Sequence, residues 1–376
     1  MLVAALAVLG ALEFRELFYF QPLGLDFLPL WTAGRMSWTH PGQVYDFVAV
    51  SHAQFWLLPG FKWLRPYAYP PTALLLLAPF GRLPFWVALG GWVALGFGVL
   101  TYAGSRLSQS RRSLALLLMV LSPAVVLAGI VGQSVLLTTA LMVLAVIDLE
   151  RRPSLAGGLI ALAAAIKPQV ALLAPVALIA GGAFEALVSA AVVEALLVMA
   201  SVAIFGPARW GEWFASLPAF QAVIDSTPGL APGAISPGGV AHALGLTGMV
   251  ATAWRAAFAL AGAVVVWLSF AAKRRGPDYR LAALSAGTLL AAPYAMHYDG
   301  ALLVPAAAVM AVESLQARSW TLRLLAFFAV CQVTGPYEGL PSVLAFIALV
   351  IGAWFMGDAP VGAPDLAPDH PVASRA

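Results

Sequence analysis

Residues 84–104 read PFWVALGGWVALGFGVLTYAG, a run of 21 residues without one charged side chain. A helix that crosses the hydrocarbon core of a bilayer needs about 20 apolar residues. This run therefore predicts a transmembrane helix. Comparable apolar runs recur along the chain at 113–130, 133–149, 185–206, 250–272, 280–295, 299–315, 321–337 and 341–357.

Three further stretches are less regular. Residues 1–20 predict a first span. Residues 154–181 are apolar but interrupted at Lys167-Pro168-Gln169, which allows two short helices or one kinked helix. Residues 70–80 are apolar but short, so we expect a short or re-entrant helix there. The total predicts an all-α polytopic membrane protein of about 10–13 transmembrane helices.

The composition agrees with a membrane protein, since 62% of the residues are hydrophobic and 10% are charged, against about 25% charged in soluble domains. The net charge of +3 is too small to indicate a nucleic-acid-binding surface. The five histidines share no metal-binding helical spacing. The chain also lacks a Gly-rich phosphate loop and a nucleophile elbow. We therefore expect no metal, no cofactor and no nucleic-acid partner.

Two long polar loops interrupt a single transmembrane domain predicted over 1–357. The first, 21–69, mixes charged residues with tryptophans, which is typical of helices at the membrane–water interface. The second, 207–249, is rich in Gly and Pro. The tail, 358–376, has no apolar period and is predicted to be disordered.

The basic loops predict the orientation, because cytoplasmic loops carry an excess of Lys and Arg. Counting spans from these loops places the loop 207–249 outside, together with the short turns at Gly132-Gln133, Lys167 and His297-Tyr298-Asp299. The loop 21–69 is also outside if the amino terminus is cytoplasmic. These polar residues could share one outward-facing site in the inner (plasma) membrane. The loops taken as cytoplasmic contain Arg106, Arg111-Arg112, Arg151-Arg152, Lys273-Arg274-Arg275 and Arg280.

Asp26 follows the first predicted span and is the candidate general base, since a carboxylate can accept the proton of an attacking hydroxyl. The alternative is a helix cap, because Asp is a preferred residue just before a helix.

Lys167 is the isolated cation of a long apolar stretch, so it needs an anionic partner or a route to water. It could bind a phosphate as a point charge. Alternatively, it could extend from a helix end to the interface.

The remaining candidates lie in short turns. His297, with Tyr298 and Asp299, could donate to a phosphate or pair with a carboxylate, or could form an interfacial turn satisfied by water. Gln133 and Tyr69 lie in turns whose default role is structural. A lipid-borne substrate suits this pattern, since its head group could reach an interfacial site while its tail stays in the bilayer.

The polar stretches, in this order, resemble glycosyltransferase family 87 over roughly residues 20–300. The resemblance rests on six short motifs, together with Pro79 and Leu83-Pro84. The motifs are Leu25-Asp26-Phe27, Trp31-Thr32-Ala33-Gly34, Gly42-Gln43-Val44-Tyr45-Asp46, Tyr67-Ala68-Tyr69-Pro70-Pro71, Gly132-Gln133-Ser134 and Lys167-Pro168-Gln169.

The resemblance implies the multi-helix GT-C architecture and an inverting sugar transfer, most often of mannose, on the outer face. The donor would be a polyprenyl-phosphate-linked sugar, and the acceptor a lipid or a glycan. Asp26 would be the base. The leaving phosphate would be bound by Lys167, His297, Lys62 and Arg65, and Tyr69, Gln133, Gln169, Tyr298 and Asp299 would line the substrate cavity. In enzymes of this architecture that bind a metal, a second acidic residue commonly lies close to the catalytic aspartate. Here Leu25 stands directly before Asp26, which disfavours a metal site.

Two other functions compete with this one. A transporter or lipid flippase would also need polar residues at helix breaks, and would often show paired broken helices. A structural subunit would not need Asp26.

Overall fold

The computed structural model describes residues 23–56, 65–107, 111–226, 234–272, 276–316, 323–324 and 340–357. Within these residues the chain forms helices and no strand, with one isolated bridge between Ala234 and Met296. The predicted all-α class is confirmed. The predicted first span at 1–20, most of the span at 321–337 and the tail at 358–376 lie outside the described residues.

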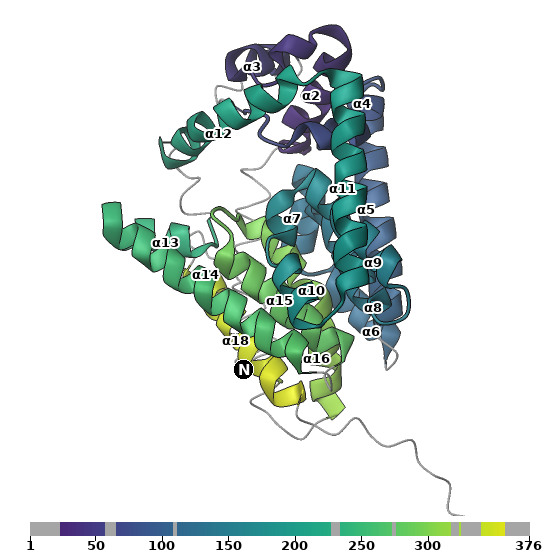
Figure 1. Cartoon of the computed structure of the whole chain (residues 1–376), viewed down its shortest axis with the longest axis vertical. Helices are drawn as coiled ribbons and strands as arrows, with labels where there is room; N and C mark the ends of the chain where they lie inside the picture. The colour runs from purple at the N-terminus through teal and green to yellow at the C-terminus, as the bar shows by residue number, and fades with distance from the viewer. Residues whose placement is uncertain are drawn as a thin grey trace, which may run out of the picture.

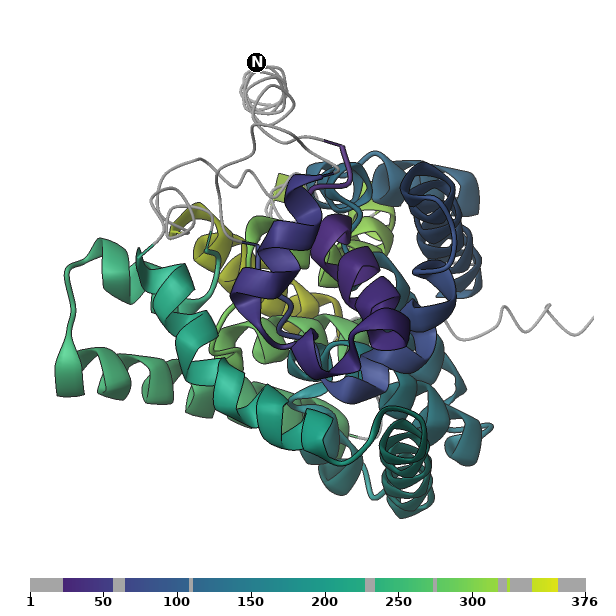
Figure 2. The same cartoon turned by 90° about the horizontal axis from the view of Figure 1, so that it is seen from above.

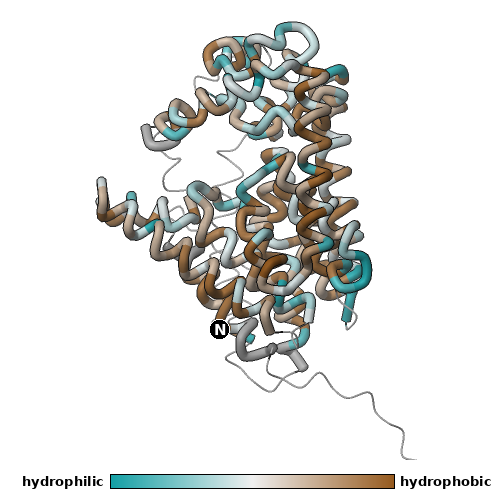
Figure 3. The backbone as a smooth tube through the Cα atoms, in the orientation of Figure 1, coloured by the Kyte–Doolittle hydropathy of each residue, from teal (hydrophilic) through white to brown (hydrophobic). Residues whose placement is uncertain are grey.

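Three described helices are long and apolar enough to cross a membrane: α5 (Phe85–Leu107), α11 (Phe184–Phe205) and α14 (Gly248–Ala271). At 1.5 Å per residue each is about 33–36 Å long, enough for a hydrocarbon core of about 30 Å. Their residues are mostly apolar, as the brown segments along the bundle show in Figure 3. On α11, for example, Val188, Val192 and Leu196 form one exposed stripe, which suits contact with lipid.

Other predicted spans are broken at prolines. Helices α6 (Arg112–Val120) and α7 (Pro123–Val131) meet at 51° and pass the same test together as one span. The residue before a proline is kept out of the α region, and Ser122 accordingly has a ψ of 135°. The stretch 154–181 divides into α9 (Pro153–Ile166), the 3-10 turn η2 (Pro168–Ala171) and α10 (Ala174–Ala180), which is the two-helix alternative.

The rest of the bundle consists of α4 (Pro71–Phe80), α8 (Val135–Asp148), α15 (Pro277–Ala291), the 3-10 turn η4 (His297–Leu302), α16 (Val304–Gln316) and α18 (Leu340–Gly357). Helix α4 has 10 residues, so it is about 15 Å long, half the hydrocarbon thickness. It is a short helix, as predicted, and packs against α2 (Phe27–Thr39) and α11.

The described parts of the two polar loops form helices. The first contains α2 (Phe27–Thr39), η1 (Pro41–Gln43) and α3 (Phe47–Phe55), and the second contains α12 (Ala208–Ser226) and α13 (Pro237–Ala243). Helices α2, α3 and α12 lie together at one end of the bundle, at the top of Figure 1 and in front in Figure 2. The opposite end carries ion pairs between Arg106 and Asp148 and between Arg280 and Glu150.

Candidate functional site

The turn that contains Asp26 is attached to the end of α7. The Gly24 amide donates to the Ile130 carbonyl at 2.8 Å, and the Asp26 amide donates to the Val131 carbonyl at 2.9 Å. The last carbonyls of a helix have no partner within that helix, so this turn supplies the missing donors. Asp26 is thereby fixed beside the turn between α7 and α8.

Gly132 makes this approach possible. It ends α7 with a φ of +73°, a left-handed conformation that glycine adopts without steric cost. A Cβ atom at this position would also lie 2.6 Å from the Cβ of Phe27. Only glycine satisfies both conditions, and it allows Asp26 and Gln133 to become neighbours.

The Asp26 carboxylate binds two side chains from distant segments. Its Oδ1 accepts from Arg65 Nη1 at 3.0 Å, and its Oδ2 accepts from Gln133 Nε2 at 3.2 Å. The Asp26 side chain makes no capping bond to α2. Both partners are donors, which suits an ionised carboxylate, because that group can only accept. The carboxylate is therefore held in one orientation, with 12% of its side chain exposed.

Tyr69 continues the hydrogen-bond chain. Its hydroxyl donates to Gln133 Oε1 at 3.0 Å and lies 3.0 Å from Ser134 Oγ. The Tyr69 carbonyl accepts from the Tyr45 hydroxyl at 3.0 Å. Burial raises the pKa of the Tyr69 phenol, so the hydroxyl stays protonated and keeps its role as a donor.

Lys167 is positioned by the proline that follows it. Pro168 cannot continue an α-helix and disfavours the helical conformation at the preceding residue. Lys167 accordingly has φ −142° and ψ 86° and ends α9. The freed carbonyl of Ala165 accepts from Thr72 Oγ1 at 2.7 Å, which attaches the start of α4 here and brings Tyr69 close.

Lys167 and Asp299 form a buried ion pair, with 4% and 3% of their side chains exposed. The other carboxylate oxygen of Asp299 accepts from the Met296 amide at 2.9 Å, which fixes η4. The Lys167 ammonium also lies 5.2 Å from the centre of the Tyr298 ring, and that ring contacts His297. Removing one partner of such a pair leaves an uncompensated buried charge.

These contacts join into one polar cluster. The bond from Thr72 to the Ala165 carbonyl joins the segment of Tyr69 to the turn of Lys167, and the nearby charges of Lys167, Asp299 and Asp26 contribute to the pKa shift of the Tyr69 hydroxyl. The polar cluster, in the sense used below, consists of Asp26, Arg65, Tyr69, Gln133, Ser134, Lys167, Tyr298 and Asp299.

The model of glycosyltransferase family 87 matches residues 67–304, more than half of the chain. The chain belongs to glycosyltransferase family 87. No match was found among curated proteins or among solved structures. Tyr69, Gln133, Lys167 and Asp299 lie within the matched residues, whereas Asp26 and Arg65 precede them.

Membership of family 87 makes this membrane protein a glycosyltransferase, which uses a sugar donor and an acceptor. The cluster contains seven of the ten residues that the sequence predicted for the site of this enzyme. Of the other three, His297 lies at the edge against Tyr298, and Gln169 is half-buried in η2. Lys62 lies outside the described residues.

The sequence placed Ser134 in a family motif but not among the predicted site residues, and it did not predict the pairing of Arg65 with Asp26. Ser134 follows Gln133 directly and is the residue before α8. Its position next to a predicted site residue was the signal that could have identified it. Nothing in the sequence pairs Arg65 with Asp26, because 39 positions separate them. Among the described residues of this family 87 enzyme, no group of three or more His, Cys, Asp or Glu side chains could hold a metal ion.

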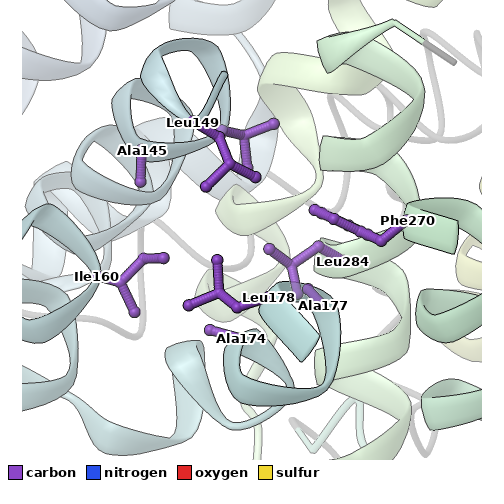
Figure 4. Close-up of a pocket in the computed structure, with 9 residues that line it drawn as sticks. Ala145, Leu149, Ile160, Ala174, Ala177, Leu178, Phe270 and Leu284 are labelled. Atoms are coloured by element: carbon purple, nitrogen blue, oxygen red, sulfur yellow. The ribbon is translucent and has the colours of Figure 1, made fainter. Parts of the chain in front are cut away.

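A separate apolar pocket lies near the other end of α8 and is shown in Figure 4. Its volume is about 10 Å³, and side chains such as Ala145, Ile160 and Leu178 line it. This is about the space of one water molecule, far too small for a sugar. The polar cluster, which brings the Asp26 carboxylate together with Arg65, Gln133 and Lys167, is the candidate site for the transferase.

Proposed function

We propose that this family 87 enzyme transfers a hexose, most readily mannose, from a polyprenyl-phosphate donor to a lipid or glycan acceptor, with inversion at the anomeric carbon. The observation that carries the proposal is the Asp26 carboxylate, held by Arg65 and Gln133 rather than used as a helix cap. The polar cluster would be the place of reaction.

Asp26 acts as the general base in this mechanism. It takes the proton of the acceptor hydroxyl while that oxygen attacks the anomeric carbon of the sugar. A new carbon–oxygen bond forms as the bond from the anomeric carbon to the phosphate oxygen breaks. The polyprenyl phosphate leaves with the electron pair of that bond, and Asp26 retains the proton until the product departs.

Cations at the cluster stabilise the leaving phosphate, because negative charge grows on it in the transition state. Lys167 is the first candidate. An ammonium has three N–H donors, and Asp299 accepts one of them. Arg65 is the second candidate within the cluster, with His297 at its edge and Lys62 in the same loop as further candidates. No nucleotide, metal or cofactor takes part.

The outer, periplasmic face is the proposed side of reaction. Helix α5 runs from Phe85, which contacts Phe27 beside Asp26, to Arg106 at the basic end of the bundle. Basic ends favour the cytoplasm, so the cluster would face outward. A single cysteine at position 297, in a chain whose Cys331 has been replaced, should react with an impermeant thiol reagent from outside. Reaction from the cytoplasmic side alone would refute this orientation.

The experiment that tests the activity uses purified protein, a lipid acceptor and a synthetic polyprenyl-phosphate mannose. We expect a glycosylated acceptor with this donor and none with a nucleotide-linked mannose. A flippase, the rival from the sequence, would move the donor across a vesicle membrane without forming the product. Movement without transfer, or transfer from the nucleotide sugar alone, would overturn the proposal.

A further inference from the structure

A second charged site lies at the basic end of the bundle. It is a hollow of about 360 Å³, within the range of small-ligand sites, and it lies between the last turns of α8 and α14, the α10–α11 turn and the start of α15. Its lining residues are Leu149, Glu150, Gly181, Ala183, Phe270 and Arg280. Helix α8 has 14 residues, so this hollow is about 20 Å from the polar cluster.

Arg280 is the buried cation of this hollow, with 10% of its side chain exposed. Its Nη1 donates to Glu150 Oε1 at 2.6 Å, and its guanidinium carbon lies 5.8 Å from the centre of the Phe270 ring. Its Nε is buried and has no hydrogen-bond partner among the described residues. A buried donor of a charged group without an acceptor is costly, so an acceptor supplied by a bound anion would stabilise this guanidinium.

The counter-ion of Arg280 is replaceable. The Glu150 side chain is 71% exposed, so it can turn into water once another anion pairs with the buried Arg280 guanidinium. Arg151 and Arg152 on the same turn are exposed, and Arg106 is near Asp148 one turn earlier. The local charge would therefore attract an anion to the hollow.

The geometry points to phosphate as the ligand. We propose that this hollow binds a phosphate group, carried by an anionic membrane lipid or free in solution. A guanidinium presents neighbouring N–H groups that match two oxygens of a phosphate, and Arg280 lines the hollow with such a group. The proposal does not depend on the sugar transfer at the polar cluster.

The walls of the hollow suit a lipid. Leu149 and Phe270 line both this hollow and the small apolar pocket of Figure 4. The phosphate would thus bind between a dry apolar wall on the inner side and the basic turn on the outer side. A phospholipid has the same order of groups, with its phosphate beside its apolar chains. Anionic lipids are also enriched at the cytoplasmic leaflet, where the basic loops are predicted.

The experiment measures binding to the full-length protein in detergent, by native mass spectrometry and by thermal shift. The probes are dioctanoyl phosphatidylglycerol and inorganic phosphate. We expect Arg280→Gln to weaken binding by about tenfold or more, because a hydrogen-bonded charge contact is lost. Arg280→Lys should be intermediate, since it keeps the charge and loses the fork of donors. Glu150→Gln should tighten binding, because it removes the competing carboxylate.

Arg152→Gln is the matched control, because it removes the same charge from an exposed position on the same turn. It should change affinity less than about threefold. Arg280-dependent binding of the lipid identifies a lipid site, and Arg280-dependent binding of phosphate alone identifies a soluble ligand. Equal losses in Arg280→Gln and Arg152→Gln would overturn the proposal, as would binding of neither probe. If Arg280→Gln does not fold, equal or weaker binding by Glu150→Gln overturns it.

Discussion

Asp26 and Asp46 each stand directly before a helix in the same polar loop, yet they have different partners. The Asp46 Oδ1 accepts from the amides of Val48 and Ala49, both at 3.0 Å, and so caps α3. The Asp26 carboxylate makes no bond to α2 and binds Arg65 and Gln133 instead. One aspartate serves its own helix, and the other belongs to a site built from distant segments.

The backbone explains the difference. A helix cap accepts from the second or third amide of its helix. In α2 the third residue is Pro29, which has no amide hydrogen, and the amide of Leu28 already donates to the Gly24 carbonyl at 3.0 Å. Asp46 also has the extended ψ of 104° that a cap needs, whereas Asp26 has a ψ of −13°. The Asp26 carboxylate is thus available to other partners.

The comparison predicts its largest effect at Asp26. Asp26→Asn should reduce sugar transfer by about 100- to 10,000-fold, because asparagine cannot accept the proton. The protein should still fold, since the amide keeps the size of the side chain. Turnover with a lipid-linked donor and a thermal melt would be measured together. Asp46→Asn is the matched control and should keep near-normal turnover. Near-normal turnover in Asp26→Asn would rule out the base assignment.

The second effect is at Lys167, inside the same cluster. Lys167→Ala should lower the free energy of unfolding by about 3–5 kcal/mol, because it leaves the Asp299 carboxylate buried and unpaired. It should also weaken donor use more than Lys167→Arg does, since arginine keeps the charge. Denaturation and KM for the donor would be compared across both variants. Unchanged donor use in folded Lys167→Ala would show that Lys167 is not part of the site. Recovery of stability in the double variant Lys167→Ala/Asp299→Ala would confirm that the loss comes from the unpaired Asp299 carboxylate.

A smaller effect is expected at Tyr69. Tyr69→Phe removes the hydroxyl that bonds Gln133 and Ser134, at a cost of about 1 kcal/mol. Turnover should fall less than in Asp26→Asn, because Gln133 can still donate to Asp26. Its amide oxygen, however, no longer accepts from the Tyr69 hydroxyl, so the Gln133 side chain is less firmly oriented. The measurement is kcat beside a thermal melt. Tyr45→Phe, which removes a hydroxyl bonded only to the Tyr69 backbone among the bonds described here, is the comparison. A larger loss of turnover in Tyr45→Phe would contradict the role given to the Tyr69 hydroxyl.

The smallest effect on activity is expected at Asp46. Asp46→Ala should cost about 0.5–2 kcal/mol of stability, the usual value of a lost helix cap, while turnover stays near that of the wild type. Asp46→Ser should recover most of the stability, because serine also caps helices. A large loss of turnover without a loss of stability would show that Asp46, too, belongs to the site, and the contrast with Asp26 would fail.

The sequence by itself predicted the helical class, the short helix at 70–80 and the break at Lys167-Pro168. These are local properties. Twenty apolar residues without a charge predict a spanning helix, and Pro168 removes a helical amide and restricts Lys167 whatever packs beside them. The bend between α6 and α7 has the same kind of signal at Pro123, although the stretch 113–130 was predicted as one span. Family membership was also predicted from short motifs in their order.

Only the tertiary structure decided which polar residues meet. Arg65 and Asp26 are 39 positions apart, Gln133 and Asp26 are 107 apart, and Lys167 and Asp299 are 132 apart. The hydropathy of a span does not depend on its neighbours, so it carries no information about which turn lies beside which. The partners are set by helix packing, through contacts such as Thr72 with the end of α9 and Phe27 with Gly132. The local backbone leaves the Asp26 carboxylate without a capping role, and the same packing supplies Arg65 and Gln133 as its partners.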